Sequence, residues 1–249
     1  MNLQKVRLCP IPFLALLEHP LGGPTAKCYA DAMRKTPFVN GELYHIFNRG
    51  VDKRSIYRDI EDVERFLESI KKFNSLTPIG SLYELSFNSL GGPTAKSDDC
   101  DEKLVEVICY CLNPNHFHLI LEQVADRGIS EFMKRLSGGY AWHFNDKYKR
   151  SGALFEGKFK SVHVSSNEQL LYVSAYVNLN NYVHQLSGPT AKLVRSSWDE
   201  YKGLTQESFC KKDIVLGQFK NAKEYEEEAR QTVEGIIERR YDIDEFLLE

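Results

Sequence analysis

The sequence predicts an α+β fold in which helices cover one face of an antiparallel sheet. Segments with the apolar pattern of strands are interspersed with segments of helical spacing, in the order strand, helix, strand, strand, helix, strand, helix. The two consecutive strands in the middle of this order are separated by a short Asn-Pro-Asn turn. Strands joined so closely pair antiparallel, and such a sheet with separate helices is typical of the α+β class.

The first half of the chain supplies a strand and a helix. Residues 1–32 show little periodicity, so we expect a poorly ordered leader before a folded domain at residues 33–196. The β-branched and aromatic residues of GELYHIFNRGV, residues 41–51, predict a strand that runs into a glycine turn. The stretch IEDVERFLESIKKFN predicts an amphipathic helix. Its apolar face carries Val63, Phe66, Leu67 and Ile70. Next, IGSLYELSF predicts a short strand before an inserted loop at about residues 86–102.

The second half of the chain supplies the remaining elements. The stretch KLVEVICYCLNPNHFHLILEQV predicts two strands, and GISEFMKRLSGGYAWHFNDKYK predicts a helix that is interrupted or ends near Gly138 and Gly139. An extended piece, ALFEGKFKSVHV, precedes a predicted helix NEQLLYVSAYVNLNNYVHQL, in which Asn167 is the expected N-cap. Residues 197–249 are predicted to form an acidic helical extension.

Charge and cysteine content limit the class of protein. The net charge of −3 argues against a nucleic-acid binder that acts by charge alone. However, Lys134 to Lys160 holds seven Lys/Arg and two Asp/Glu, whereas the chain from Asp199 onward holds fourteen acids and eight bases. A basic working surface and an acidic tail are therefore compatible with the total. The six cysteines lack a disulfide spacing, and no apolar run is long enough to span a bilayer, which indicates a cytoplasmic protein.

The motif NHFHLIL places two histidines on one face of a predicted strand. Side chains alternate along a strand, so His116 and His118 share a face, while Phe117, Leu119 and Leu121 share the other. We expect the two imidazoles to be exposed side by side as a pair of ligands for a divalent metal. Two alternatives remain: solvent-exposed histidines without a function, and a zinc site that adds Cys109 and Cys111.

A second motif, AYVNLNN, brings a tyrosine and an amide to one helix face. Tyr176 and Asn180 are four residues apart, which places them one helical turn apart. Tyrosine can act as a covalent nucleophile, and the Asn180 oxygen could complete the metal site. Alternatively, Tyr176 could be one packing residue among the thirteen tyrosines. Tyr172 is a weaker candidate, because the residue four positions later is Tyr176 rather than an oxygen ligand.

The basic and aromatic stretch from residue 134 to residue 160 suits single-stranded nucleic acid. Lysine and arginine, here including Lys134 and Arg135, would contact phosphates while bases stack on the aromatic rings. The alternative is that this stretch is only a solvated helix face that binds no nucleic acid.

Five segments, in order, resemble the single-tyrosine HUH transposases, in particular the REP-associated tyrosine transposases. They are YHIFNRGVDKRSIY, CYCLNPNHFHLIL, SGALFEGKFKS, YVNLNN and SSWDEYKGL, which span roughly residues 36–205. The resemblance implies a ferredoxin-like HUH nuclease fold, with His116 and His118 as ligands of Mg²⁺ or Mn²⁺ and Tyr176 as nucleophile. Asn180 falls at the third ligand position. Many relatives have Asn-Pro where this chain has Asn180-Asn181, so the proline that would help to end the helix is absent here.

The resemblance also implies an activity and a partner. Tyr176 would attack a phosphate of single-stranded DNA beside a hairpin, form a 5′-phosphotyrosine and later allow the strand to be rejoined. The implied DNA contacts are Arg49, Lys53, Arg54, Lys158 and Lys160. Tyrosine and histidines could meet within one chain or across a homodimer. The alternative function is a hairpin-binding protein that has lost cleavage.

The heptapeptide LGGPTAK occurs at residues 21–27 and 90–96, and a near copy, LSGPTAK, occurs at 186–192. Leu-Gly-Gly can be encoded by CTT-GGC-GGT, whose reverse complement, ACC-GCC-AAG, encodes Thr-Ala-Lys. The peptide can therefore be the translation of an inverted repeat with the proline codon as its loop.

The first hypothesis for this repeat is a mobile DNA palindrome of the kind such a transposase acts on, inserted where loops tolerate it. The alternative is a repeated linker peptide.

The gene sequence distinguishes these hypotheses. A mobile palindrome should leave complementary codons on both sides of the proline codon in all three copies, with one base change for Ser187. Synonymous codons that break the complementarity would contradict it. The second measurement is binding of the purified protein to a single strand with this hairpin, against a scrambled stem; equal binding would exclude the palindrome as a ligand.

Overall fold

The structure is a computed structural model that describes residues 37–77, 102–205 and 209–246. The described residues from Phe38 onward belong to one compact unit. The predicted leader at residues 1–32, the strand predicted in IGSLYELSF and nearly all of the predicted inserted loop lie outside the described residues. Within the described part, none of the helices has the length and apolar character needed to cross a membrane.

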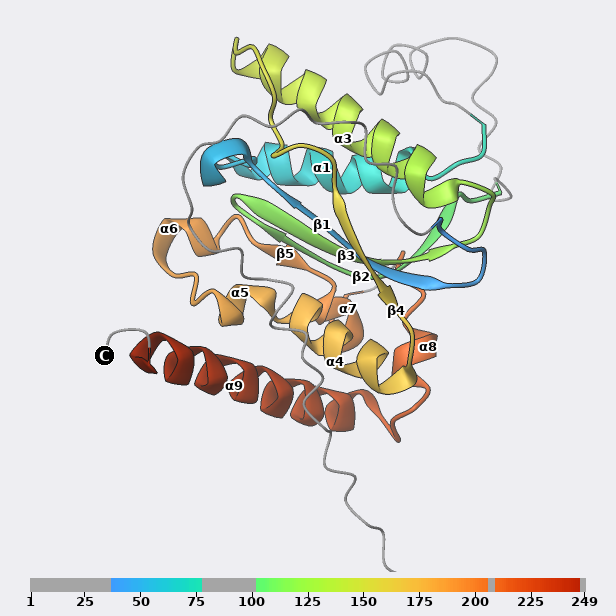
Figure 1. Cartoon of the computed structure of the whole chain (residues 1–249), viewed down its shortest axis with the longest axis vertical. Coiled ribbons are helices and arrows are strands. Elements are labelled where there is room, and N and C mark those ends of the chain that lie inside the picture. Colours follow the sequence, from blue (N-terminus) through green and yellow to red (C-terminus); the bar gives the residue numbers. More distant parts are fainter. Residues whose placement is uncertain (1–36, 78–101, 206–208, 247–249) are drawn as a thin grey trace, which may run out of the picture. The chain divides into compact units, whose positions relative to one another are not determined.

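The described strands form one antiparallel sheet in the order β4-β1-β3-β2-β5 (Figure 1). The strands are β1 (Leu43–Arg49), β2 (Val105–Asn113), β3 (His116–Gln123), β4 (Lys160–Val164) and β5 (Arg195–Ser196). The long strands β2 and β3 form the hairpin that the Asn-Pro-Asn turn predicts. The predicted α+β class with an antiparallel sheet is therefore confirmed.

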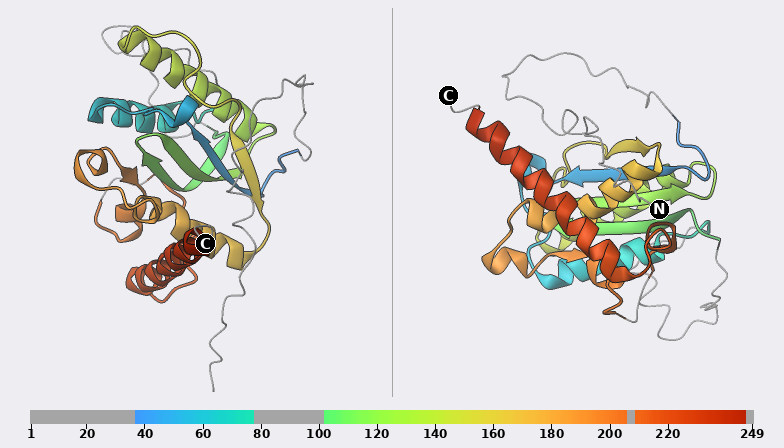
Figure 2. Two further views of the ribbon diagram at one scale, coloured as in Figure 1. Left: turned by 60° about the vertical axis from the view of Figure 1, so that its left-hand side comes forward. Right: turned by 90° about the horizontal axis from the view of Figure 1, so that it is seen from below.

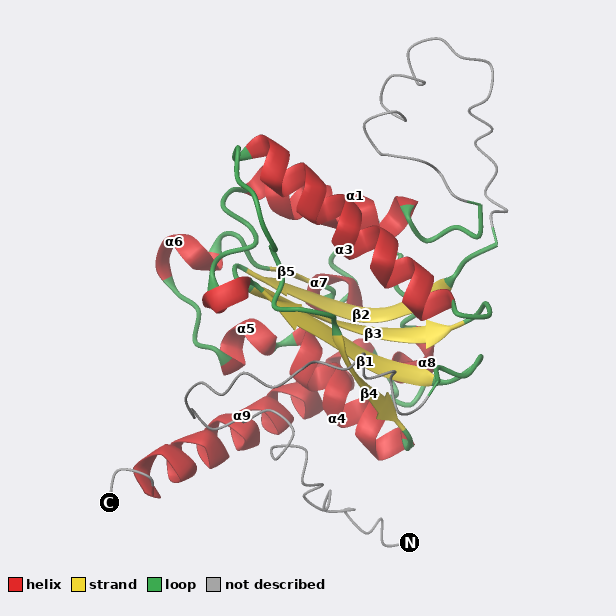
Figure 3. Cartoon of the chain, turned by 45° about the horizontal axis from the view of Figure 1, so that its top comes forward, coloured by secondary structure: helices red, strands yellow, loops and turns green. Residues whose placement is uncertain are grey.

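Helices cover both faces of this sheet, whereas the sequence led us to expect them on one face. Helices α1 (Ile60–Lys72) and α3 (Gly128–Lys147) lie on one side, and α4 (Asn167–Asn178) and α9 (Ala222–Phe246) lie on the other (Figures 1 and 3). The reason is that the histidine face of the central strands is also apolar. Cys109 and Ile120 are fully buried there, so this face needs its own helical layer.

Helix α1 forms where its apolar periodicity predicts. Asp59 caps it by accepting a hydrogen bond from the amide of Asp62, and Val63, Phe66 and Ile70 are fully buried. Helices α1 and α3 are also joined by an ion pair, in which Lys147 Nζ lies 2.8 Å from Asp59 and 2.9 Å from the buried Asp62.

Helix α3 runs without interruption through Gly138 and Gly139, which corrects the predicted break. Gly139 is required by packing rather than by a turn. A Cβ atom there would lie 2.9 Å from the ring of Phe73, the residue that ends α1. A Cβ at Gly138 would meet nothing within 4 Å. Glycine at residue 139 therefore lets the two helices approach closely.

Helix α4 differs from the prediction at both ends. Its N-cap is Ser166, whose side chain accepts from the amide of Gln169, rather than Asn167. The helix ends at Asn178, because Leu179 leaves the helical conformation with φ −110° and ψ 21°, and the chain resumes as α5 (Asn180–Val183). Tyr176 and Asn180 are thus on two consecutive short helices instead of one.

Short elements complete the fold. They are the 3₁₀ turn η2 (Val51–Lys53) and the helices α6 (Gly188–Ala191), α7 (Trp198–Tyr201) and α8 (Asp213–Leu216). The third copy of the repeat, residues 186–192, contains α6, which has no buried residue. A surface position of this kind tolerates an inserted segment. The first two copies lie outside the described residues.

Two single substitutions in α3 test the role of Gly139. Gly138→Ala should raise the free energy of unfolding by about 0.5–1 kcal/mol, because alanine is the better helix former. Gly139→Ala should lower it, because its methyl group would collide with the Phe73 ring, which is 6% exposed. Urea unfolding of both variants measures the difference. Equal stabilisation by both substitutions would mean that the Phe73 ring shifts to accommodate the methyl group without lowering the free energy of unfolding.

Candidate functional site

The histidine pair lies on β3, the central strand of the sheet, beneath helix α4. His116 is partly exposed at the start of the strand, but His118 is only 5% exposed. This corrects the expectation of two exposed imidazoles: α4 packs against β3 and covers His118. The other face carries Phe117, Leu119 and Leu121 in the core, as the alternation predicts.

Hydrogen bonds fix the ring of His116. Its Nδ1 lies 2.6 Å from Oδ1 of Asn115, which can only accept, so Nδ1 carries the proton. In the neutral ring, Nε2 then presents a lone pair. That atom lies 2.9 Å from Nδ2 of Asn113 and 3.1 Å from Oδ1 of Asn180.

Asn113 and Asn180 complete this group. The Asn113 amide donates to Asn180 Oδ1 over 2.7 Å as well as to the imidazole. The Asn113 amide nitrogen therefore faces two acceptor atoms. The lone pairs of His116 Nε2 and Asn180 Oδ1 both point toward this nitrogen. Both asparagine side chains are fully buried, so this polar group lies inside the fold.

His118 contacts a second buried histidine. Its Nδ1 lies 2.8 Å from Nε2 of His45 on β1, and the two rings stack with centroids 5.1 Å apart. Burial lowers the pKa of His45 to about 3. Burial, with smaller contributions from neighbouring histidines, also holds the pKa of His118 well below its ordinary value. Both rings are therefore neutral at physiological pH, as a metal-ligating imidazole must be.

Tyr176 lies over this pair within the same chain. It is 4% exposed, and its ring meets that of His118 edge to face with centroids 5.5 Å apart. Tyr172, the weaker candidate, instead places its hydroxyl 3.5 Å from Arg239 on α9. The tyrosine of the second motif, and not its neighbour one turn earlier, is therefore brought to the histidines.

The tyrosine helix is held by the C-terminal part of the chain. Helix α9 lies across α4 in both views of Figure 2. The buried Asn178 donates to the hydroxyl of Tyr225 over 2.9 Å and accepts from the hydroxyl of Ser197 over 2.6 Å. Ser174 is 3.2 Å from the same Tyr225 hydroxyl. These buried hydrogen bonds fix the turn of α4 that carries Tyr176.

One group of the predicted DNA contacts borders this site. Arg49 pairs with His116 across β1 and β3, and Lys160 pairs with Phe47 across β4 and β1. Arg49 also forms an ion pair with Glu156. Three further members of the group follow β1 or precede β4 in the chain: Lys53, Arg54 and Lys158.

The other predicted contacts lie on the far side of the sheet. Lys134 and Arg135 belong to α3, which is separated from α4 by the strands. Arg135 donates to Glu131 and to the carbonyl of Ser75, and its side chain is 15% exposed. It therefore holds α3 in place.

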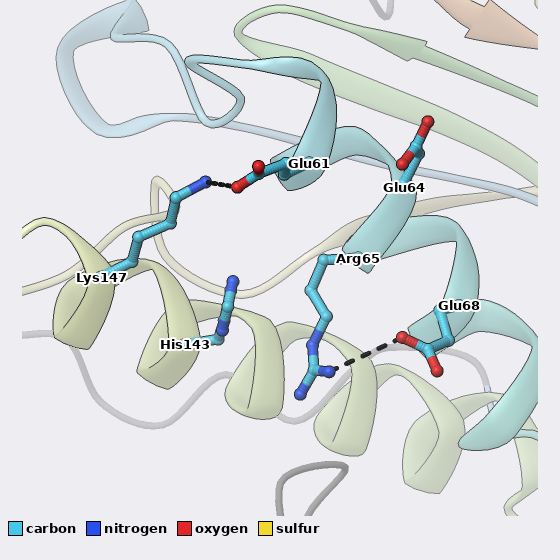
Figure 4. Close-up of a pocket in the computed structure, with 6 residues that line it drawn as sticks. All are labelled: Glu61, Glu64, Arg65, Glu68, His143 and Lys147. Carbon is cyan, nitrogen blue, oxygen red and sulfur yellow. Dashed lines mark hydrogen bonds and ion pairs between the residues drawn. The ribbon is translucent and has the colours of Figure 1, made fainter. Parts of the chain in front are cut away.

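An open pocket of about 500 Å³ also lies between α1 and α3 (Figure 4), away from Tyr176.

The cysteines of the alternative zinc site lie on the histidine face, since Cys111 pairs with His118 across β2 and β3. Burial raises the pKa of Cys111 to about 12 and that of Cys109 well above its ordinary value, so both thiols are protonated at neutral pH in the metal-free protein. Zinc binds the thiolate form. Among the described residues, no group of three or more His, Cys, Asp or Glu side chains is arranged to hold a metal.

Two residues of the site, His45 and Asn113, were not selected from the sequence. Both are fully buried polar residues. Asn113 could have been found, because it precedes the turn and must pair with His116 in a tight hairpin. His45 carries only a weak signal, a histidine within the apolar pattern of a strand.

The segment from residue 94 to residue 180 matches the model of the IS200-like transposase family. This segment contains both histidines, Tyr176 and Asn180. No protein of curated function matches the chain.

Two solved structures are similar to this chain at low identity. One is a REP-associated tyrosine transposase bound to a REP hairpin, with 11% identity, a TM-score of 0.42, and coverage of 72% of this chain and 97% of that chain. The other is a provisionally assigned transposase from Deinococcus radiodurans R1, with 15% identity, a TM-score of 0.33, and coverage of 61% and 97%. At TM-scores below 0.5, neither similarity indicates the function of this chain.

The donor set fits the divalent cation that the transposase resemblance implies. His116 Nε2 and Asn180 Oδ1 are 3.1 Å apart and share one hydrogen-bond donor, which a cation would replace. An amide oxygen is the kind of ligand that Mg²⁺ and Mn²⁺ take, and a neutral imidazole offers the nitrogen lone pair that a divalent cation requires. His118 is the adjacent imidazole on the same face, with its ring centroid 5.2 Å from that of His116.

Metal titration tests this donor set. We expect His116→Ala and His118→Ala to abolish Mn²⁺ binding and cleavage. Asn180→Ala should weaken binding and be partly rescued by more Mn²⁺, because water can replace one oxygen ligand. Isothermal titration calorimetry of the full chain measures the affinities, and Asn181→Ala is the matched control, expected to bind like the unaltered protein. Full-strength binding by Asn180→Ala would place the third ligand elsewhere.

Proposed function

We propose that this protein is a metal-dependent transposase that cleaves and rejoins single-stranded DNA through Tyr176. The observation that supports this most strongly is the position of Tyr176 directly over His118, beside the His116–Asn180 donor pair, within one chain. The match of this segment to the IS200-like transposase family agrees with it. The site needs no second chain to bring these residues together.

The proposed reaction is a transfer of a phosphodiester bond to tyrosine. The Tyr176 oxygen attacks a backbone phosphorus and forms a 5′-phosphotyrosine, while the bond to the 3′ oxygen breaks and that oxygen leaves as a hydroxyl after taking up a proton. In the reverse direction, a 3′-hydroxyl attacks the phosphotyrosine and releases Tyr176. A divalent cation bound at the site would act as a Lewis acid on a phosphate oxygen.

The other side chains of the site have positioning roles in this proposal. His116, His118 and Asn180 would hold Mg²⁺ or Mn²⁺, and the buried hydrogen bonds of Asn178 keep Tyr176 over them. Because the site is mostly buried, its polar groups act in a low dielectric and interact more strongly than they would in water.

The substrate we propose is single-stranded DNA with a hairpin beside the cleavage site. Arg49, Lys53, Arg54, Lys158 and Lys160 would contact phosphates. Arg49 pairs with His116 at the end of β1, Lys160 pairs with Phe47 at the start of β4, and the other three residues follow β1 or precede β4 in the chain. We also propose that the protein acts in the cytoplasm, which agrees with the free, buried thiols of Cys109, Cys111 and Cys210.

The substitution Tyr176→Phe tests the nucleophile, because it removes only the hydroxyl oxygen. We expect the covalent protein–DNA adduct to disappear, while binding to hairpin DNA stays within a few-fold, because affinity depends mostly on phosphate contacts. Denaturing gel electrophoresis with labelled single strands detects the adduct, and Tyr172→Phe is the control that should retain it. An adduct that persists in Tyr176→Phe would exclude this tyrosine. Hairpin binding by the unaltered protein without cleavage would instead support a binding protein.

A further inference from the structure

The fully buried histidine of β1, His45, has no part in the reaction described above. Its neighbours on the same sheet face include Ile120 and the ring of Phe47, which are apolar. Burying a polar group in such surroundings costs free energy unless a hydrogen bond compensates for it. His45 makes such a bond, since its Nε2 lies 2.8 Å from Nδ1 of His118.

The sheet holds His45 in a fixed place relative to His118. His45 pairs directly with Ile120, so His118, two residues before Ile120, is its diagonal neighbour on the same face. Strand β1 is paired on both sides, with β3 and with β4, so it lies inside the sheet. The Tyr176 ring makes T-shaped contacts with both imidazoles. The pairing of β1 with β3 and β4, together with the Tyr176 ring, therefore holds the His45–His118 contact in place.

The two histidines of the proposed metal site are held in the same manner. His116 is bound at Nδ1 by the Asn115 oxygen over 2.6 Å, and His118 is bound at Nδ1 by His45 over 2.8 Å. In each ring this leaves Nε2 as the remaining nitrogen. A ligating histidine generally donates its second ring N–H to a nearby acceptor, which fixes the tautomer and the orientation of the ring.

We propose that His45 is a positioning residue: its Nε2 accepts the Nδ1 proton of His118, which keeps the lone pair of His118 on Nε2 for a divalent cation. This inference rests on the proposed function. His45 does not itself contact the cation or the DNA. Without it, the His118 proton would be free to move to Nε2, and the ring would no longer present a lone pair toward the site.

Metal binding by three variants of the full chain tests the role of His45. His45→Phe keeps an aromatic ring but removes the acceptor, and we expect the Mn²⁺ dissociation constant to rise by about 10–100-fold. His45→Gln retains an acceptor oxygen and should recover most of the affinity. Phe47→Leu is the matched control: the Phe47 ring stacks on His118 without a hydrogen bond, so its loss should change the affinity little.

A spectroscopic readout separates positioning from packing. Nitrogen-15 NMR of the histidine rings in the metal-free protein should show the proton of His118 on Nδ1 in the unaltered chain. In His45→Phe, part of the population should carry it on Nε2. A His118 proton on Nε2 in the unaltered chain would overturn the inference, as would unchanged Mn²⁺ affinity in His45→Phe. Absence of Mn²⁺ binding by the unaltered chain would instead refute the proposed function.

Discussion

The pairing of β3 with β1 on one side and β2 on the other is the constraint on which the whole site depends. This register places Asn113 and Arg49 on either side of His116, and Cys111 and Phe47 on either side of His118. A slip of one residue would turn both histidines toward α1 and α3. The apolar residues that alternate with them along β3, Phe117, Leu119 and Leu121, are buried in the opposite core and prevent such a slip.

Local patterns were sufficient for much of the fold and the site. The alternation in NHFHLIL placed the two histidines on one face, and periodicity located α1 correctly. Local patterns failed where contacts between segments far apart in the chain determine the structure. The uninterrupted helix at Gly139 depends on Phe73, and the second helical layer depends on the burial of Ile120. His45 was missed because the pairing of β1 with β3 joins segments far apart in the chain.

The distribution of charge follows the two faces of the sheet only in part. The basic residues around the ends of β1 and β4 lie near the histidines, although Arg49 is paired with Glu156. On the other side, Lys147 and Arg135 are engaged in ion pairs that join or brace α1 and α3. A basic stretch in the sequence thus divides into residues near the proposed DNA path and residues that stabilise the fold.

The hydrogen bonds around Asn178 give the acid-rich end of the chain a genetic consequence. Both partners of this buried amide, Ser197 and Tyr225, are encoded after the tyrosine and the histidines. A nonsense mutation between their codons would leave the codons of all the proposed catalytic and metal-binding residues intact, yet the Asn178 amide would lose an acceptor inside the fold. Selection on the chemistry proposed for Tyr176 would therefore extend to the reading frame downstream of it, at least as far as the codon of Tyr225.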